Sequence, residues 1–289
     1  MKRIGISTDC VCDLPESFLK ANGVDLMYFY IDTNTGKFRD GYGITSGNVL
    51  EYLEEGNTKA ETAAPEPREY VEFFESELEQ CDELIHISIS SHIGHSCENA
   101  MAALKLMGEK VERVTVIDSE HLSTGMGHMV MLAVEMRGDG KSAAEIVEAV
   151  KALRSRVSTT FITPNADYLY RNGRVNKTVR KLTAIFSLHP VLVVKRGRIA
   201  LKTVQIGNYE KAVMRYIRSE LKKSARIHSK RLFITHAGCP VRMISRVKEE
   251  AGRMCQFDEV IVTQASATVS CNCGAGTVGV LFVHKKRES

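Results

Sequence analysis

Two closely spaced cysteine pairs are the residues of this sequence with the most obvious capacity for chemistry. Cys10 and Cys12 lie between two aspartates in STDCVCDLP, and Cys271 and Cys273 lie in SCNCGAG near the other end of the chain. Structural zinc sites usually separate paired cysteines by about two to four residues, and redox sites use C-x-x-C. The C-x-C spacing therefore indicates small residues that fill tight turns, and we expect no metal. Four thiols could still hold a metal if both pairs faced one cleft.

Signatures of other catalytic chemistries are absent from the sequence. It contains no G-x-S-x-G elbow, no Walker loop and no G-x-G-x-x-G. The segment SSHIGHS offers serines and histidines, but closeness in sequence does not by itself build a catalytic relay. The segment STGMG, from Ser123 to Gly127, is typical of a helix start made of small residues, suited to close packing or to an anion. We therefore expect no catalytic residue.

Composition predicts a globular protein of two ordinary domains. The chain has 289 residues, of which 44% are hydrophobic and 26% charged. Its apolar runs are too short to cross a bilayer, and the N-terminal MKRIGISTDC lacks the apolar stretch of a signal peptide. We therefore expect a cytoplasmic protein with no membrane span, whose eight cysteines are free thiols in a reducing compartment.

Charge is strongly segregated along the chain. Residues 1–170 contain 15 Lys and Arg against 28 Asp and Glu, whereas residues 171–231 contain 17 against two. Such segregation is typical of a face that meets an acidic partner, and it also fits a set of solvated helix faces. No RNA- or DNA-binding motif accompanies the basic segment, so we expect no nucleic-acid partner.

The first half of the chain alternates buried strands with amphipathic helices, which predicts a parallel, helix-covered sheet. Asp13 is the expected N-cap of the first helix, and Thr45 or Ser46 begins another that stops at Gly56. Asn34 and Gly36 predict a hairpin turn. The predicted strands cover residues 3–8, 24–32, 83–90 and 113–118, and the predicted helices cover residues 14–22, 44–56, 67–80, 95–108, 127–140 and 142–156.

Three loops of this half should lie close together. Each follows a strand, and the carboxyl ends of parallel strands open on one edge of the sheet, where ligands bind. The loops STDCVCD, SISSHIGHS and DSEHLSTGMG contain Asp9, Ser91, Ser119 and the nearby Gly125. We expect these four residues, together with Arg174 of the second half of the chain, beside a ligand cleft.

The second half predicts an α+β unit with a mixed sheet. A hairpin turns around Arg196 and Gly197, and a basic amphipathic helix follows. We place the boundary near Arg156, which gives an N-terminal domain of residues 1–156 and a C-terminal domain of residues 157–289. The predicted helices cover residues 165–173, 179–187, 209–225 and 240–252, and the predicted strands cover residues 189–204, 231–237, 258–265 and 276–285.

Nine segments, taken in chain order, resemble the loops of DegV family proteins. The family has a two-domain α/β architecture and binds a long-chain fatty acid in a tunnel between the domains. In some bacteria its members present the carboxylate to a fatty acid kinase for phospholipid synthesis. The resemblance therefore implies a carrier with a bound fatty acid, no other cofactor and no catalytic activity. The segments are STDCVCDLP, FRDGYGIT, ETAAPEP, SISSHIGHSCENA, VIDSEHLSTGMG, DYLYRNGRV, HPVLVVKRGRI, ITHAG and CNCGAGTVGV.

The resemblance is weakest where the family holds the carboxylate. The family uses a Thr, a Ser and a His, which fall on Thr62, Gly94 and Asn272. Two interpretations follow. In the first, His95 or Ser96 supplies the lost donors and a fatty acid still binds; in the second, the pocket takes another ligand, such as a neutral or bulkier lipid.

Two further hypotheses stay open at this point. Arg174, in NGRV, matches an arginine of the family that either docks a kinase subunit or bonds loop carbonyls. The alternative to a carrier is an enzyme or a sensor for another small ligand, with a cleft refitted around His92, His95, Cys271 and Cys273.

Overall fold

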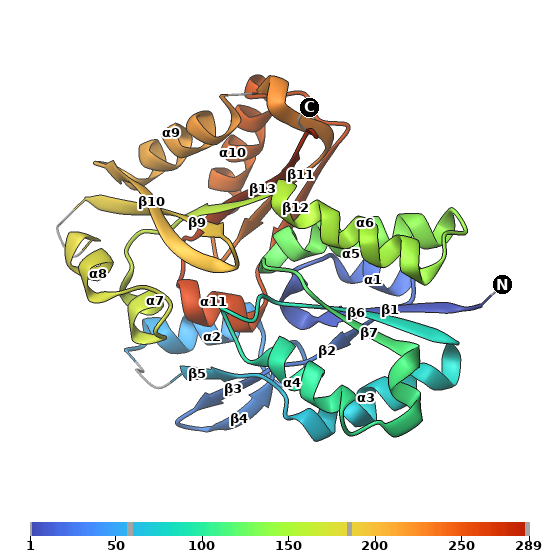
Figure 1. Cartoon of the computed structure of the whole chain (residues 1–289). Helices are drawn as coiled ribbons and strands as arrows, with labels where there is room; N and C mark the ends of the chain where they lie inside the picture. Colours follow the sequence, from blue (N-terminus) through green and yellow to red (C-terminus); the bar gives the residue numbers. More distant parts are fainter. Residues whose placement is uncertain (1, 57–59, 184–186, 223, 287–289) are drawn as a thin grey trace.

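The computed structural model of the protein describes residues 2–56, 60–183, 187–222 and 224–286 (Figure 1). Within these residues the strands form three sheets: one of four strands, one of six and one of three. None of the helices in the described ranges is long and apolar enough to cross a membrane. The predicted class, a parallel helix-covered sheet followed by a unit with a mixed sheet, is confirmed.

The four-stranded sheet is parallel throughout, in the order β2-β1-β6-β7. Both of its faces are covered by helices, α3 and α4 on one and α5 and α6 on the other (Figure 1). Leu84 of β6 packs with side chains of α3 and α4, and Ile85 packs with side chains of α5 and α6. The strands are Ile4–Asp9 (β1), Val24–Met27 (β2), Glu83–Ser88 (β6) and Val114–Asp118 (β7), and the helices are Glu16–Ala21 (α1), Pro67–Gln80 (α3), Ser96–Leu104 (α4), Ser123–Gly138 (α5) and Ala143–Leu153 (α6).

The strand predicted over residues 24–32 is wrong, because the chain leaves the parallel sheet after β2. At Phe29 the backbone N–H donates to Cys10 Sγ (3.4 Å) and the carbonyl accepts from Asp40 N (2.9 Å), so neither group extends a strand. The chain then forms an antiparallel sheet in the order β4-β3-β5, whose hairpin turns where predicted, with Thr33 opposite Gly36. Its strands are Tyr30–Thr33 (β3), Gly36–Arg39 (β4) and Ala60–Ala63 (β5).

The six-stranded sheet is mixed, in the order β10-β9-β8-β13-β11-β12, and only β11 and β12 are parallel to each other. Helices α9 and α10 cover one face (Figure 1). The edge strand β10 carries an irregularity between Leu201 and Thr203. The elements are Val157–Ile162 (β8), Leu188–Lys195 (β9), Arg198–Ile206 (β10), Ile227–His236 (β11), Glu259–Gln264 (β12), Val278–His284 (β13), Tyr209–Leu221 (α9) and Val241–Met254 (α10).

Helix α5 lies between the two large sheets and packs on both. It begins at Ser123, four residues before the predicted start, and its first turns are almost wholly buried. A side chain at Gly125 would collide with Thr159 of β8, and one at Gly127 would collide with Leu14. The small residues of STGMG therefore permit close packing, one of the two roles that the sequence suggested.

Helix α11, Ala267–Cys273, was not predicted, and it joins the two halves of the chain. It packs against α2, Ser46–Glu54, in a core that also contains Ile31 and Ala265. All strands of the four-stranded sheet precede residue 156 and all strands of the six-stranded sheet follow it, but this shared core crosses that position. The division into two domains near residue 156 stays a prediction.

The predicted helix starts are partly right. Thr45 caps α2, since its hydroxyl accepts a hydrogen bond from Asn48 N at 3.3 Å. Asp13 does not cap α1: Pro15 precedes that helix, and Asp13 adopts a left-handed conformation with φ of 52°. The two short helices are Asp167–Arg171 (α7) and Lys177–Thr183 (α8), and residues 184–186 of the second prediction lie outside the described residues.

We predict that Gly125→Ala destabilises the protein by about 1–3 kcal/mol, the usual cost of inserting a methyl group into a packed core. Thr159 is buried and its hydroxyl is bonded to His121 Nδ1 (2.9 Å), so it cannot easily move aside. Urea unfolding measures the effect.

The matched control is Gly138→Ala in the same helix, where an added Cβ meets no atom within 4 Å. We expect it to leave stability unchanged or to raise it by up to about 1 kcal/mol. Equal effects of the two variants would contradict the packing argument.

Candidate functional site

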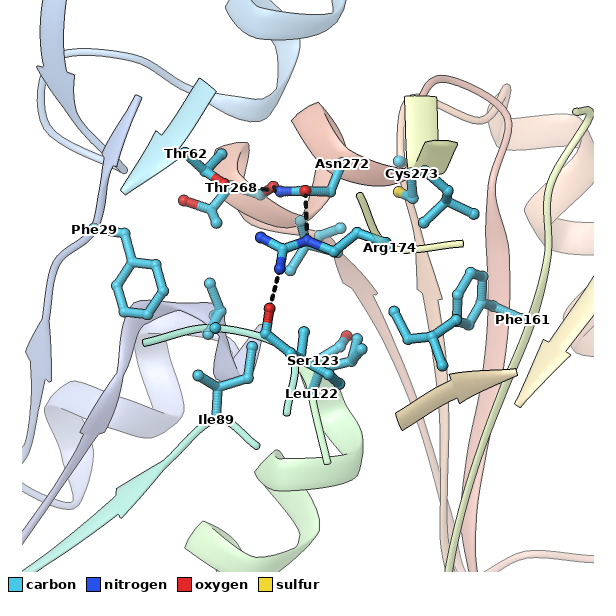
Figure 2. Close-up of a pocket in the computed structure, with 18 of the residues that line it drawn as sticks. Phe29, Thr62, Ile89, Leu122, Ser123, Phe161, Arg174, Thr268, Asn272 and Cys273 are labelled. Atoms are coloured by element: carbon cyan, nitrogen blue, oxygen red, sulfur yellow. Dashed lines mark hydrogen bonds between the residues drawn. The ribbon is translucent and has the colours of Figure 1, made fainter. Parts of the chain in front are cut away.

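A cavity of about 560 Å³ lies between the sheets, beside the first residues of α5. This volume is within the range of about 300–1,000 Å³ found for small-molecule pockets. Most of its wall is apolar, and both halves of the chain contribute to it (Figure 2). Its apolar lining includes Phe29, Ile89, Leu122, Phe161, Val269 and Leu281.

Polar side chains gather in one part of this wall. Asn272 of α11 donates from Nδ2 to Thr62 Oγ1 (3.2 Å) and to the Thr268 carbonyl (2.8 Å). Its Oδ1 accepts from Arg174 Nε (3.1 Å), and Arg174 also donates from Nη1 to the Ile93 carbonyl (Figure 2). A segment after α7, strand β5 and helix α11 thus meet in one hydrogen-bonded cluster, which we call the polar cluster: Thr62, Arg174, Thr268 and Asn272.

The residues predicted to bind a carboxylate fall into different places. Thr62, Gly94, His95 and Asn272 line the cavity. Both amide protons of Asn272 are already used, and the Gly94 N–H donates to the Ser90 carbonyl (3.2 Å), so neither residue has a free N–H to offer a ligand. The His95 side chain is 84% exposed at the rim, with Nδ1 3.1 Å from Glu98 Oε2.

Ser96 does not line the cavity. Its hydroxyl is 2.8 Å from Asp9 Oδ2, in a wholly buried network in which Asp9 also accepts from Ser88 and Tyr70. Burial works to raise the pKa of Asp9, but His86 and the hydrogen bonds from Ile89 N and Ser88 hold that pKa below its ordinary value. Asp9 also accepts from the backbone N–H of the lining residue Ile89 (2.8 Å), so Asp9 and Ser96 support the wall from outside the lining, and the prediction that Ser96 binds the ligand directly is not supported by its position.

The other predicted cleft residues also support the loops from outside the lining. Ser91 Oγ donates to Asp118 Oδ2 (2.6 Å), and Ser119 Oγ donates to the His121 carbonyl (3.1 Å). The loops do meet at one edge, as expected, because Ser90 N donates to the carbonyl of His121 (2.9 Å). Gly125 serves packing on Thr159.

Both cysteine pairs are buried, and burial opposes the formation of reactive thiolates. Cys10 and Cys12 form a buried 3₁₀ turn after β1, and burial raises the pKa of Cys12, Cys271 and Cys273 to about 12. His95 and Cys273 line the cavity, whereas His92 and Cys271 do not. Among the described residues, no group of three or more His, Cys, Asp or Glu side chains is arranged to hold a metal ion.

Comparison with known proteins identifies the family. A family model described as "Uncharacterised protein, DegV family" matches residues 3–285. The chain belongs to the DegV family. A DegV domain-containing protein of Caldanaerobacter subterraneus subsp. tengcongensis is 27% identical over 286 residues, which cover 99% of this chain and 100% of that protein.

Solved structures share the fold of this DegV family protein. One, from Thermus thermophilus, is described as fatty acid binding of a DegV family protein; its TM-score is 0.86 at 24% identity, over 98% of this chain and 100% of that one. Another is the Streptococcus pneumoniae fatty acid kinase B3 protein loaded with linoleic acid, with a TM-score of 0.85 at 17% identity, over 98% of this chain and 100% of that one.

Two polar features of this DegV protein were missed from its sequence. The first is the place of Arg174 in the cavity wall; its hydrogen bond to the Ile93 carbonyl, by contrast, agrees with one of the two roles that the sequence left open. The second is Thr268, which lines the cavity, is 6% exposed and donates from its backbone N–H to Asp40 Oδ2 (2.8 Å). The pair of Ser266 as N-cap and Gly274 as C-terminal glycine marks helix α11, and could have placed Thr268 and Asn272 on one helix.

Two buried carboxylates fix α11 in place. Asp13 Oδ1 accepts from Ser266 N (2.8 Å), and Asp40 accepts from Ala267 N (3.0 Å) and Thr268 N (2.8 Å). Asp13 Oδ2 also accepts from the hydroxyl of Ser123, at the start of α5, at 2.5 Å. Burial raises the pKa of Asp13 to about 7 and also raises the pKa of Asp40.

We predict that Asp13 makes stability fall as pH rises from about 4 to about 7. Its folded pKa of about 7 exceeds its ordinary value of 3.8, so in this window the folded state keeps a proton that the unfolded state has lost. Asp13→Asn removes this dependence, and its stability relative to the wild type should rise by up to roughly 3–4 kcal/mol across the window.

Denaturant unfolding at several pH values from 4 to 8 measures this difference. The control is Glu16→Gln, which removes an exposed carboxylate three residues further along and should leave the wild-type slope intact. A constant difference between Asp13→Asn and the wild type at all pH values would show that Asp13 is ionised throughout.

Proposed function

We propose that this protein is a carrier that binds a long-chain fatty acid in the cavity, with its carboxylate at the polar cluster. The observation that carries the proposal is a largely apolar cavity with polar side chains gathered in one part of its wall. Each buried methylene contributes about 0.8 kcal/mol, so a chain of about sixteen carbons supplies on the order of 10 kcal/mol before ordering costs. The fatty acids named for structures of the same fold support this assignment.

Thr62 is a suitable donor for the carboxylate. Its oxygen accepts from Asn272, which leaves the hydroxyl proton free to donate into the cavity. Hydrogen bonds to a charged acceptor are stronger than neutral ones, so this proton favours an ionised head group. The interpretation that a fatty acid still binds, in place of a neutral or bulkier lipid, is the one we adopt.

We further propose that the protein presents the acid to a fatty acid kinase. The tip of the β9–β10 hairpin carries exposed Lys195 and Arg198, and the Gly197 carbonyl between them accepts from Ser90 Oγ (2.8 Å). This contact sets basic side chains beside the loop that contains Ile89 and Ile93 of the cavity wall. Such a rim suits an acidic partner surface, and the structural likeness to a fatty acid kinase B3 protein supports a kinase as that partner.

We expect long-chain fatty acid to be released when the purified protein is denatured, extracted and analysed by mass spectrometry. We also expect Gly94→Ser to bind hexadecanoic acid about 3- to 10-fold more tightly than the wild type, because it adds a hydroxyl at the cavity wall. An added Cβ at Gly94 meets no atom within 4 Å, so the side chain has room. Calorimetric titration measures the affinity.

Gly94→Ala is the matched control, since it adds the same carbon without the hydroxyl. Equal affinities of the Ser and Ala variants would place the carboxylate elsewhere. Failure of the wild type both to release and to bind a long-chain acid would refute the proposed function.

For the kinase, we predict that Lys195→Glu combined with Arg198→Glu weakens binding to the kinase subunit of the same organism by about tenfold at low ionic strength. The control is Arg242→Glu combined with Lys248→Glu, which reverses two exposed charges on α10. Surface plasmon resonance at two salt concentrations tests both pairs. Equal effects would mean that the hairpin is not the docking surface, and no binding of the wild type would leave a carrier without this partner.

A further inference from the structure

We infer that Gly279 lets the acyl chain cross strand β13 and thereby sets how long a fatty acid the cavity accepts. The inference rests on the proposed function, because it concerns which fatty acid the protein carries. Three observations support it: the place of Gly279 in the six-stranded sheet, a backbone conformation there that other residues can adopt, and neighbouring hydroxyl groups that are already bonded within the protein.

Gly279 lies within a row of residues that runs across the six-stranded sheet. Its neighbours in this row are Thr235 of β11 and Phe161 of β8, and all three line the cavity. Thr277, just before β13, and Leu281, within it, line the cavity as well. The residues between them belong to the core on the opposite face of the sheet. Gly279 therefore faces the cavity, where it leaves a strip of bare backbone among these side chains.

The backbone at Gly279 could carry a side chain. Its φ lies outside the left-handed region that favours glycine. An added Cβ would lie 3.1 Å from Leu281 Cδ1 and 3.2 Å from the Thr160 carbonyl oxygen. Both contacts are tight, yet neither is a collision of the kind that Thr159 imposes at Gly125. Glycine weakens the interior of a strand, and it often marks a place where a ligand approaches the backbone closely.

The hydroxyl groups around this strip are bonded within the protein. Thr235 Oγ1 lies 2.7 Å from Thr124 Oγ1 and 2.9 Å from Thr263 Oγ1. Thr277 Oγ1 donates to the Cys273 carbonyl at 3.0 Å. Strand β13 pairs with β8 on one side and β11 on the other, so its backbone polar groups are used in two ladders. A wall whose polar groups are satisfied in this way suits the hydrocarbon tail of a ligand and not its head group.

Phe161 connects this strip to an apolar part of the cavity wall. Leu169 packs with Phe161 in a buried cluster and also lines the cavity. Figure 2 shows Phe161 apart from Thr62 of the polar cluster, with Arg174 between them. An acyl chain whose carboxylate lies at the polar cluster and whose end lies beside Leu169 therefore passes over Gly279.

A side chain at position 279 would occupy space that the acyl chain uses. Acids that end before Gly279 keep all their contacts, whereas longer acids lose the burial of every methylene beyond it. The loss of affinity therefore depends on chain length, which distinguishes it from a general loss of structure.

The test is competition between hexadecanoic and dodecanoic acid for the delipidated full-length protein, measured by native mass spectrometry. We expect the wild type to prefer hexadecanoic acid by about 100-fold, because its additional methylenes are buried. In Gly279→Ala the preference should fall to about tenfold, and in Gly279→Val to roughly threefold or less, while affinity for dodecanoic acid changes little.

The matched control is Val283→Ile, which enlarges a side chain on the same face of β13 outside the cavity lining and should keep the wild-type ratio. An unchanged ratio in Gly279→Val, or equal losses of affinity for both acids, would overturn the inference while leaving a fatty acid carrier. If Gly279→Val does not fold, the ratio in Gly279→Ala decides. Failure of both acids to bind the wild type would instead refute the proposed function.

Discussion

The attachment of α11 to two buried carboxylates is the interaction on which the candidate site depends. Asp13 and Asp40 come from the N-terminal part of the chain and bind the first backbone N–H groups of a helix near the C-terminus. That helix in turn carries Asn272, which orients Arg174. The polar cluster is therefore assembled from segments more than 200 residues apart, such as those of Thr62 and Asn272, whose bond closes it.

Close packing of α5 supplies the complementary constraint. Because Gly125 and Gly127 bring the helix against Thr159 and Leu14, the two large sheets share one helix as a common layer. The cavity lies beside its first residues, which include Ser123, a lining residue that also binds Asp13. The cavity and its polar cluster thus depend on the same few contacts between distant parts of the sequence.

Local features were predicted well from the sequence, whereas features that depend on contacts between distant residues were predicted poorly. The alternation of strands and helices, the Thr45 cap and the turn before Gly36 depend on neighbouring residues, and they were predicted correctly. The break at Phe29 and the real partners of Asp13 depend on contacts with residues far along the chain, which periodicity cannot reveal. Thr62 and Asn272 were placed through the family resemblance, whereas the hydrogen bond of Arg174 to Asn272 could be seen only in the structure.

The edge strand β10 has a consequence for the behaviour of the protein in concentrated solution. A free strand edge can pair with a strand of another molecule and so promote aggregation. Here the edge is broken by the irregularity at Leu201 and carries Arg198 and Lys202, of which Lys202 reaches across to Glu220. The uneven, positively charged border should therefore discourage fibril-like stacking between copies of the protein.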